Sequence, residues 1–365
     1  MLMNIDRKID LIRREPTEEI VTEEELRHLL LSKSNVRAYD GFEPSGLLHL
    51  GSGLLRAIKL QDFIDAGIHF ILYIADWFAY LNNKFGSDMD VIRKVGEYYI
   101  EGWRACGVDI SKVEIKWSSD LAKLPEYWET FLKISRNVTI NRVTRSVAVM
   151  GRRESEVKQF SFLVYPIMQA TDIFMLKVDI CQLGIDQRKV NILAREIGPK
   201  VGFWKPVIVS HHLLIGLQGP AKMGGYDESA QIDLQISSKM SKSRPETCIY
   251  IHDDEKDIRD KIRKAYCPPK QTELNPVLEI CRYIIFRKMD SLRIKREAKY
   301  GGLLEFKSYS ELEQAYRNGI VHPLDLKIAV AEALNEIIEP IRTYFENNEK
   351  AYKLYEAVRK FEVTR

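Results

Sequence analysis

The stretch from Tyr39 to Gly53 constrains the fold of this chain more than any other. It begins in a short apolar run, Val36–Asp40, that predicts a buried strand. Glycine, proline and serine then break the run, and Leu54–Ile64 carries apolar residues at helical spacing. A strand, a glycine-rich turn and a helix in this order direct backbone N–H groups and the positive helix end toward an anion. The stretch therefore predicts a phosphate site beside His49, although it lacks G-x-G-x-x-G and the chain has no G-x-x-x-x-G-K-[ST].

Strands and helices alternate from residue 36 to residue 216. Such alternation predicts βαβ units and a Rossmann-like α/β domain with a parallel sheet, whose ligands bind at the carboxyl ends of the strands. Residues 1–35 are expected to be helical, with Thr22 as a helix cap. The further strands expected are His69–Ala75, Val113–Trp117, Val178–Gln182 and Lys205–Val209. The further helices expected are residues 89–106, 125–136, 139–150, 161–176 and 186–197.

The alternation stops after residue 216. Residues 217–238 interrupt the pattern, and residues 219–238, which contain clustered glycines, are expected to form a long mobile loop. From about Asp253 the pattern is only helical, and Pro340 is expected to end or kink the helix that contains it. We therefore expect an α/β domain over residues 1–250 and an all-α domain over residues 251–365.

Charge and cysteine content narrow the class of protein. The net charge of +3 does not require a nucleic-acid partner. Residues 286–300 hold six basic residues against two acidic ones, which suits either phosphate contacts or a solvated helix face. The five scattered cysteines form no C-x-x-C and fit a reducing cytosol. With no apolar signal core and no apolar run long enough to span a bilayer, a cytoplasmic protein without a membrane partner is expected.

Two groups of residues suggest ligand binding. Lys239-Met-Ser-Lys-Ser243 has two lysines three residues apart, which suits a cationic clamp for a polyphosphate or, alternatively, a solvated basic loop. Tyr165, Gln169 and Asp172 recur on one face of an apolar helix. Because a buried carboxylate and amide need partners, this face predicts either a polar ligand pocket or a structural hydrogen-bond cluster.

Two further groups of candidate residues come soon after predicted strands. Gly184-Ile-Asp-Gln-Arg-Lys189 places Asp186 where it either caps the next helix or accepts from ribose hydroxyls. His211 and His212 have no third ligand at a suitable spacing. We therefore expect an exposed histidine pair near a strand end rather than a metal site.

The order of these pieces resembles the class I aminoacyl-tRNA synthetases, and most closely the tyrosyl-tRNA synthetases of the archaeal and eukaryotic type. The resemblance covers nearly the whole chain and includes His49-Leu-Gly51, the Tyr165 to Asp172 face and residues 184–189. Residues 239–243 match the class motif letter for letter. Ser52 departs from the class motif, which usually has histidine there.

The resemblance implies a pocket for L-tyrosine. Tyr39 and Asp172 are expected to bind the phenol hydroxyl. Tyr165, Gln169 and Gln187 are expected to bind the α-ammonium group. Phenylalanine would leave Asp172 unpaired, and tyrosyl-tRNA synthetases are the standard example of rejection by this means.

The resemblance also implies ATP with Mg²⁺ as a substrate. The tyrosine carboxylate would attack the α-phosphorus, and catalysis would rest on positioning and charge stabilisation. His49, Lys239 and Lys242 are the catalytic residues implied. The residues implied around ATP are Gly41, Glu43, His49, Gly51, Gly184, Asp186, Lys239, Met240 and Lys242.

The second substrate implied is tRNA(Tyr), with the domain over residues 251–365 reading its anticodon. Asp325 would accept from a guanine on which Tyr300 stacks, and His322 begins the matching stretch. From the residues alone, Asp325 is equally a helix cap. Arg145 and Arg188 are expected near the acceptor end. A homodimer is implied, with its interface on apolar helices within residues 103–150 of the catalytic domain.

Three alternatives remain open at this point. A tryptophanyl-tRNA synthetase shares the fold and the lysine motif, but indole has no hydroxyl for a Tyr39–Asp172 pair. A non-catalytic, synthetase-like RNA-binding protein would not need the intact motif and pocket. A nucleotidyltransferase acting on a small molecule would not need the helical C-terminal domain.

Overall fold

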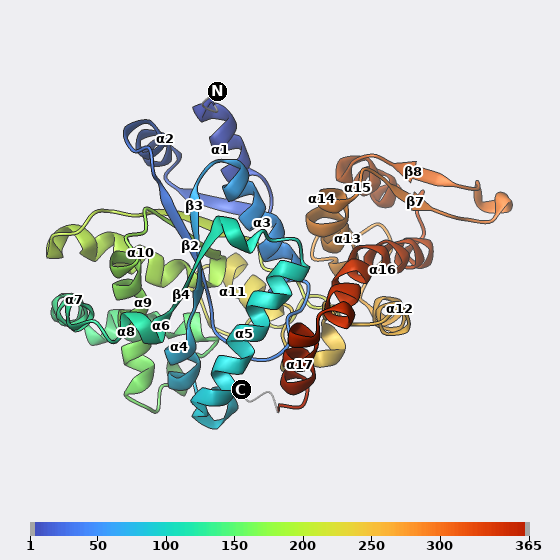
Figure 1. Cartoon of the computed structure of the whole chain (residues 1–365). Helices are drawn as coiled ribbons and strands as arrows, with labels where there is room; N and C mark the ends of the chain where they lie inside the picture. Colours follow the sequence, from blue (N-terminus) through green and yellow to red (C-terminus); the bar gives the residue numbers. More distant parts are fainter. Residues whose placement is uncertain (1–3, 362–365) are drawn as a thin grey trace.

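The computed structural model describes residues 4–361 and is built around a six-stranded sheet (Figure 1). The strands lie in the order β1-β6-β5-β2-β3-β4. Each neighbouring pair is parallel except β1 and β6, which are antiparallel. The strands are β1 Thr17–Val21, β2 Arg37–Phe42, β3 His69–Ile74, β4 Val113–Trp117, β5 Ile180–Gly184 and β6 Val207–His211.

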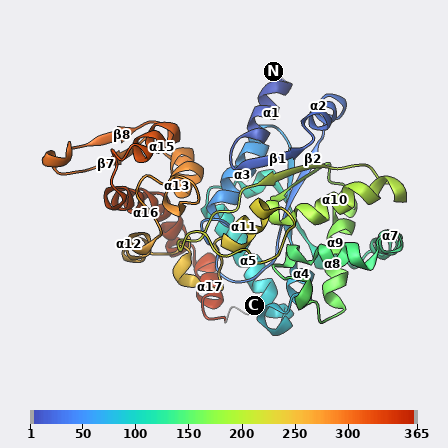
Figure 2. The ribbon, with the colours of Figure 1, turned by 180° about the vertical axis from the view of Figure 1, so that it is seen from behind.

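Helices pack on both faces of this sheet (Figures 1 and 2). Those between β2 and β6 belong to the crossovers that parallel strands require. The helices before residue 239 are α1 Ile5–Arg13, α2 Glu23–Ser32, α3 Leu54–Asp65, α4 Asp76–Leu81, α5 Met89–Ala105, α6 Ser118–Leu121, α7 Pro125–Arg136, α8 Ile140–Arg145, α9 Ser161–Met175, α10 Arg188–Ile197 and α11 Ala230–Ser238.

Successive side chains of β2 enter two different apolar cores. Ala38 and Phe42 pack in the core that contains α3 and α5. Tyr39 packs in the core that contains α9 and α10. Because side chains alternate along a strand, the same strand directs Asp40 to the α3 side and Tyr39 to the α9 side. This alternation gives the sheet a distinct chemistry on each face.

Most predicted elements of this part are confirmed, with local shifts. The strands predicted at residues 178–182 and 205–209 lie two residues later, at β5 and β6. The expectation that residues 1–35 are all helical is wrong at β1, an edge strand whose two glutamates gave it a polar pattern. The helix predicted over residues 139–150 ends at Arg145 and is followed by a 3-10 turn, Val147–Met150. Thr22 caps α2 by accepting from the Glu25 backbone N–H at 3.2 Å.

The C-terminal part is helical with one hairpin. The hairpin extends away from the rest of the molecule in Figures 1 and 2, and the expectation of helices alone after residue 253 is wrong there. Of the two effects expected of Pro340, an end to its helix is wrong, because α16 continues to Asn347, and a kink stays a prediction. The elements are α12 Glu255–Lys264, α13 Pro276–Ile280, a π-helical turn Cys281–Ile285, α14 Phe286–Lys288, β7 Leu292–Ile294, β8 Leu304–Phe306, α15 Tyr309–Arg317, α16 Pro323–Asn347 and α17 Glu349–Val358.

The two parts of the chain share an apolar core. Buried residues of α3 and α5 belong to the same cluster as those of α12 and α16. The domain boundary near residue 250 therefore stays a prediction. Across residues 4–361, no helix has the length and apolar character needed to cross a lipid bilayer.

Candidate active site

A cavity of about 380 Å³ lies at the carboxyl ends of the central strands. From β2 the chain goes outward to β3 and β4, then returns to the other side of β2 to form β5 and β6. The crossovers thus diverge between β2 and β5, the point where open α/β sheets bind ligands. Ten residues predicted for the site line this cavity: Gly41, Glu43, His49, Gly51, Tyr165, Asp186, Gln187, Lys239, Met240 and Lys242.

The glycine-rich turn after β2 holds His49 against the cavity. The Gly51 backbone N–H donates to His49 Nδ1 at 3.1 Å, which assigns the ring proton to Nε2. Burial, together with Lys242 and Lys239 nearby, holds the pKa of His49 well below its ordinary value. His49 is therefore a neutral imidazole with one N–H available to a ligand.

Ser52, the letter that departs from the class motif, has a role in this turn. Its Oγ accepts from the His49 backbone N–H at 3.1 Å. A Cβ on the next residue, Gly53, would lie 2.9 Å from Ile251 Cγ2, so only glycine lets α3 begin this close to the C-terminal part. Ser52 and Gly53 together fix the backbone that carries His49.

Asp172 lies at the centre of a buried group of phenols. Its Oδ1 accepts from the Tyr127 hydroxyl at 2.9 Å. Within residues 4–361, Asp172 Oδ2 and the hydroxyl groups of Tyr39 and Tyr73 are buried without a hydrogen-bond partner. Burial raises the pKa of Asp172 to about 8. Because buried polar atoms are nearly always paired, these three atoms indicate a pocket that takes a polar ligand group.

The predicted ammonium site joins this pocket through α9. Tyr165, Gln169 and Asp172 are all buried on that helix, as their spacing predicts. Gln169 Nε2 donates to Gln187 Oε1 at 3.1 Å, and Gln187 Nε2 donates to the Val149 carbonyl at 3.1 Å. The structure therefore brings together the amide groups predicted from positions far apart in the sequence.

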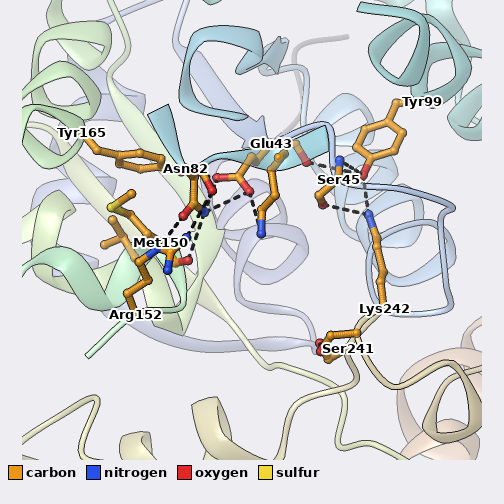
Figure 3. A network of polar contacts seen from close by, with 12 residues as sticks. Glu43, Ser45, Asn82, Tyr99, Met150, Arg152, Tyr165, Ser241 and Lys242 are labelled. Atoms are coloured by element: carbon orange, nitrogen blue, oxygen red, sulfur yellow. Dashed lines mark hydrogen bonds and ion pairs between the residues drawn. The ribbon is translucent and has the colours of Figure 1, made fainter. Parts of the chain in front are cut away.

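Glu43 lies between this pocket and the phosphate turn (Figure 3). Its Oε2 accepts from the Tyr165 hydroxyl at 3.2 Å. Asn82 Nδ2 donates to the carboxylate at 3.0 and 3.2 Å, and Lys84 Nζ lies 3.7 Å from Oε1. Arg152 Nε in turn donates to Asn82 Oδ1 at 2.8 Å, so several side chains hold this carboxylate in place.

Asp186 and Lys239 form an ion pair across the cavity. Lys239 Nζ donates to Asp186 Oδ2 at 2.7 Å. Asp186 makes no cap bond to α10, so the alternative of a helix cap is wrong. Burial disfavours the charged form of Asp186, but Lys239 and Arg56 outweigh it and lower its pKa. Asp186 Oδ1 is buried without a partner and is free to accept from a ligand hydroxyl.

Arg56 is a cavity residue that the sequence patterns did not single out. It forms a buried ion pair with Asp40, and its guanidinium lies 5.2 Å from the Phe42 ring centre. Burial raises the pKa of Asp40 to about 6 even beside this arginine. In sequence, Arg56 looks like one charged position on an amphipathic helix, so only the fold reveals it.

The lysine motif is fixed rather than freely solvated, so the alternative of a solvated basic loop is wrong. The Met240 N–H donates to the Leu214 carbonyl at 2.7 Å, and Ile215 pairs with Lys239. The expected mobile loop over residues 219–238 is wrong at its end, where α11 leads into the motif. Asp233 of that helix accepts from the Gly225 and Tyr226 N–H groups, which ties the preceding segment down.

The histidine pair is buried, so the expectation of an exposed pair is wrong. His211 Nδ1 lies 2.6 Å from Gln182 Nε2. His212 lies between two carboxylates, with Nδ1 at 2.6 Å from Glu18 and Nε2 at 3.0 Å from Glu279. The pair entered the interior because β6 extends to His211, two residues past its predicted end.

The residues predicted to bind tRNA lie in two separate places. Arg145 and Arg188 are on α8 and α10, on the opposite side of the sheet from α16 in Figures 1 and 2. Arg188 binds Glu19 at 2.8 Å, whereas Arg145 is exposed. His322 caps α16 by accepting from the Leu324 N–H at 3.2 Å, so Asp325 is not the cap. The side chain of Tyr300 lies outside the part of the chain that the structure describes.

Comparisons with known proteins match the chain along nearly its whole length. The family model for class I tRNA synthetases of the W and Y type matches residues 31–238 and 233–339. A tyrosine–tRNA ligase from Thermococcus kodakarensis is 42% identical over 378 residues, covering 100% of both chains. One from Sulfurisphaera tokodaii is 44% identical, covering 99% of this chain and 98% of its own. The solved tyrosyl-tRNA synthetase from Pyrococcus horikoshii, complexed with L-tyrosine, superposes with a TM-score of 0.89 at 40% identity, covering 98% and 100%.

Proposed function

The chain belongs to the class I tRNA synthetases for tryptophan and tyrosine, and from this premise we propose how its residues attach tyrosine to tRNA. Its activity is that of an ATP-dependent tyrosine–tRNA ligase, the activity named for full-length relatives at 42 and 44% identity. The observation that carries the residue assignment is the group of unpaired buried atoms around Asp172. These atoms lie on the face of the sheet that α9 covers, and the phosphate turn that follows β2 lines the cavity.

The phenol of tyrosine would complete the hydrogen bonding of that group. The substrate hydroxyl donates to Asp172 Oδ2 and accepts from Tyr39, with Tyr73 beside it. Phenylalanine would leave these atoms buried and unpaired, which is costly. Indole offers a donor but no acceptor, so a tryptophan side chain would leave Tyr39 unpaired. This pocket therefore favours tyrosine over both.

The α-ammonium group of tyrosine would lie among Tyr165, Gln169 and Gln187. Neutral amide and phenol oxygens accept from an ammonium group. The adjacent Glu43 supplies negative charge, since its Oε2 already meets the Tyr165 hydroxyl at 3.2 Å. The amino-acid carboxylate then faces the cavity in which ATP would bind.

Adenylate formation needs no general base, because the attacking carboxylate is already ionised. One carboxylate oxygen forms a bond to the α-phosphorus of ATP·Mg²⁺ while the bond to the bridging oxygen breaks and pyrophosphate leaves with its electrons. The Nε2–H group of His49 donates a hydrogen bond to a phosphate oxygen while the imidazole stays neutral. Lys239 and Lys242 stabilise the growing charge. We infer catalytic roles for these three residues from their places on the cavity wall.

The rest of ATP would be held by the surrounding turns. Gly41 and Gly51 let the backbone approach the nucleotide, and Met240 packs beside it. Asp186, ionised and with Oδ1 unpaired, accepts from ribose hydroxyls. Gly184 belongs to the same site, because a Cβ there would lie 2.6 Å from Asp186 Oδ1.

In the second step, a ribose hydroxyl of the terminal adenosine of tRNA(Tyr) attacks the tyrosyl carbonyl, and AMP leaves. We propose Arg145 and Arg188 as contacts for the acceptor end. In the helical domain over residues 251–365, we propose Asp325, His322 and Tyr300 as contacts for the anticodon. The helix cap at His322 leaves the Asp325 carboxylate free for a base, which supports this role.

We also propose a homodimer formed through the catalytic domain. Leu124, Trp128, Leu132 and Ile140 on and around α7 and α8 are 42, 45, 64 and 74% exposed. A cluster of large exposed apolar side chains is typical of a protein interface. All five cysteines are buried thiols without a disulfide, which suits the cytoplasmic location that we propose.

Charging of tRNA tests this function. The purified protein is incubated with ATP·Mg²⁺, tRNA(Tyr) and radiolabelled tyrosine, tryptophan or phenylalanine. We expect acid-precipitable tyrosine on tRNA and background counts with the other two. Charging with tryptophan would favour the tryptophanyl enzyme, and tRNA binding without charging would favour a non-catalytic RNA-binding protein.

A further inference from the structure

Tyr99 contacts two segments of the candidate active site, the turn that follows β2 and the lysine motif at residues 239–243. It lies on α5 and is 1% exposed, yet its hydroxyl reaches the cavity wall (Figure 3). The hydroxyl oxygen accepts from the Ser45 backbone N–H at 3.1 Å, in the turn that follows β2. It also accepts from Lys242 Nζ in the lysine motif. One side chain from α5 therefore contacts both Ser45 in the turn and Lys242 in the lysine motif.

Lys242 contacts hydroxyl groups at the cavity wall. Its Nζ lies 4.8 Å from the centre of the Tyr99 ring and donates to Ser45 Oγ at 3.3 Å. The other lysine of the motif, Lys239, is fixed by the carboxylate of Asp186. Lys242 forms no ion pair with any residue between 4 and 361. A phenol ring and hydroxyl groups are therefore its polar partners.

The chemistry of that partner suits a lysine that must bind phosphate. A carboxylate would neutralise the ammonium group and compete with ATP for it. A phenol holds the same group through its oxygen but leaves the positive charge in place. It also restricts a flexible side chain whose ordering costs rotamer entropy. A polyphosphate can therefore displace the phenol and find the ammonium group already at the cavity wall.

We propose that Tyr99 is a positioning residue for adenylate formation, which holds the Lys242 ammonium group at the cavity wall and releases it to the phosphate oxygens of ATP. This inference rests on the role in phosphate stabilisation proposed above for Lys242. The effect of Tyr99 on the rate therefore passes through Lys242.

The neighbouring residue Tyr98 provides a matched control. Its hydroxyl also accepts from a backbone N–H of the turn, that of Leu48 at 3.2 Å. Its other polar partner is His252, at 2.8 Å, and not Lys242. Removing the hydroxyl from Tyr98 deletes one backbone contact to the turn, and removing it from Tyr99 deletes two, because the Tyr99 hydroxyl also donates to the Glu43 carbonyl at 3.4 Å. Only the change at Tyr99 also deletes a contact to the lysine motif.

The test measures single-turnover adenylate formation by rapid quench in Tyr99→Phe, Lys242→Ala and the double variant. Tyr99→Phe keeps the ring, so the fold and tyrosine Kd should be unchanged. We expect Tyr99→Phe to lower the rate about tenfold, the effect of one hydrogen bond to a charged group. Lys242→Ala should lower it on the order of a hundredfold. Adding Tyr99→Phe to Lys242→Ala should change the rate less than twofold.

Each outcome decides the question. If Tyr99→Phe slows the reaction equally with and without Lys242, the residue acts through its contacts to Glu43 and Ser45 in the turn, and the inference is wrong. An unchanged rate in Tyr99→Phe also overturns it. If Lys242→Ala itself keeps the full rate, the proposed role of Lys242 fails first, and the inference fails with it. Tyr98→Phe should give the same fold-change in both backgrounds, which calibrates the additive case.

Discussion

The substitution Asp172→Asn tests the phenol pocket most sharply. In the structure, Asp172 Oδ1 accepts from the Tyr127 hydroxyl at 2.9 Å, and Oδ2 is buried without a partner. An asparagine must give its only acceptor oxygen to Tyr127, because an amide nitrogen cannot accept. The amide NH₂ group then occupies the place of Oδ2. The phenol hydrogen of the substrate loses its acceptor, although the shape of the pocket is unchanged.

The size of the effect follows from burial. A lost hydrogen bond at a fully buried site costs about 1–3 kcal/mol, which corresponds to about 5- to 150-fold weaker tyrosine binding. The pH matters, because burial raises the pKa of Asp172 to about 8. Below that pH the free carboxyl is protonated, and it must lose its proton to accept from the phenol. Between pH 6.5 and 8.5, tyrosine affinity of the unaltered protein should therefore rise on the order of tenfold.

Calorimetric titration with tyrosine measures both effects. We expect the largest loss for Asp172→Asn at pH 8.5 and no pH dependence in the variant. Asp179→Asn is the matched control. Asp179 is a buried carboxylate at the amino end of β5, away from the cavity, and it binds Lys33 at 2.7 Å. Its tyrosine Kd should not change, and ATP binding should be unaffected in both variants. An unchanged Kd in Asp172→Asn at pH 8.5 would refute the placement of the phenol at this carboxylate.

Three further outcomes follow from single contacts. Burial disfavours the charged form of His212, but Glu279 and a second glutamate outweigh it and raise its pKa to about 10. A raised pKa stabilises the fold fully below pH 6.5, so urea unfolding should lose up to about 5 kcal/mol as the pH rises to 10, and His212→Gln should remove this slope. Gly184→Ala should raise the KM for ATP about tenfold without changing tyrosine Kd, because its Cβ would lie 2.6 Å from Asp186 Oδ1. Leu132→Glu should convert a dimer to a monomer in analytical ultracentrifugation, because it places a charge on the exposed face of α7.

Controls and contrary results are available for each of these. A flat pH profile in the unaltered protein would show that His212 is not held charged by its glutamates. A rise in tyrosine Kd in Gly184→Ala would show that Gly184 affects the tyrosine pocket as well as the ATP site. Leu303→Glu, on the C-terminal hairpin and 60% exposed before substitution, should leave the dimer intact. An intact dimer in Leu132→Glu would place the interface elsewhere.

The central sheet could be predicted because buried parallel strands have a simple signal. After its first residue, the strand His69–Ile74 is continuously apolar, since both of its faces are covered, and the predicted strand begins at the same residue. The strand Val113–Trp117 and the helix Pro125–Arg136 have the predicted bounds. In each case the local pattern agrees with the burial that the fold imposes.

The strands that were missed are stabilised by partners far away in the sequence. In β1, Glu18 and Glu19 look like solvent-facing residues, but the folded chain pairs them with His212 and Arg188. The hairpin of β7 and β8 has three residues in each strand, too few for an alternating pattern to register. Tertiary partners, rather than local propensity, decide such segments.

The site was predicted by resemblance more than by physical pattern. Residues with an unusual chemistry for their place, such as His49 and Lys242, could be recognised as candidates from the sequence. Tyr73, Tyr127 and Tyr99 could not, because a tyrosine in an apolar run reads as an ordinary core residue. A tyrosine of the site differs from a core tyrosine only in the surroundings of its hydroxyl oxygen, and only the structure shows these surroundings.

Amino-acid-dependent exchange between ATP and labelled pyrophosphate tests the central claim most directly, because it isolates adenylate formation from every contact with tRNA. The protein is supplied with ATP·Mg²⁺ and equal concentrations of tyrosine, phenylalanine or tryptophan in separate reactions. We expect rapid exchange with tyrosine, and a Tyr39→Phe variant should lose part of its preference for tyrosine over phenylalanine. Exchange driven by tryptophan, or equal exchange with phenylalanine and tyrosine, would contradict the assignment of the buried pocket to the phenol of tyrosine.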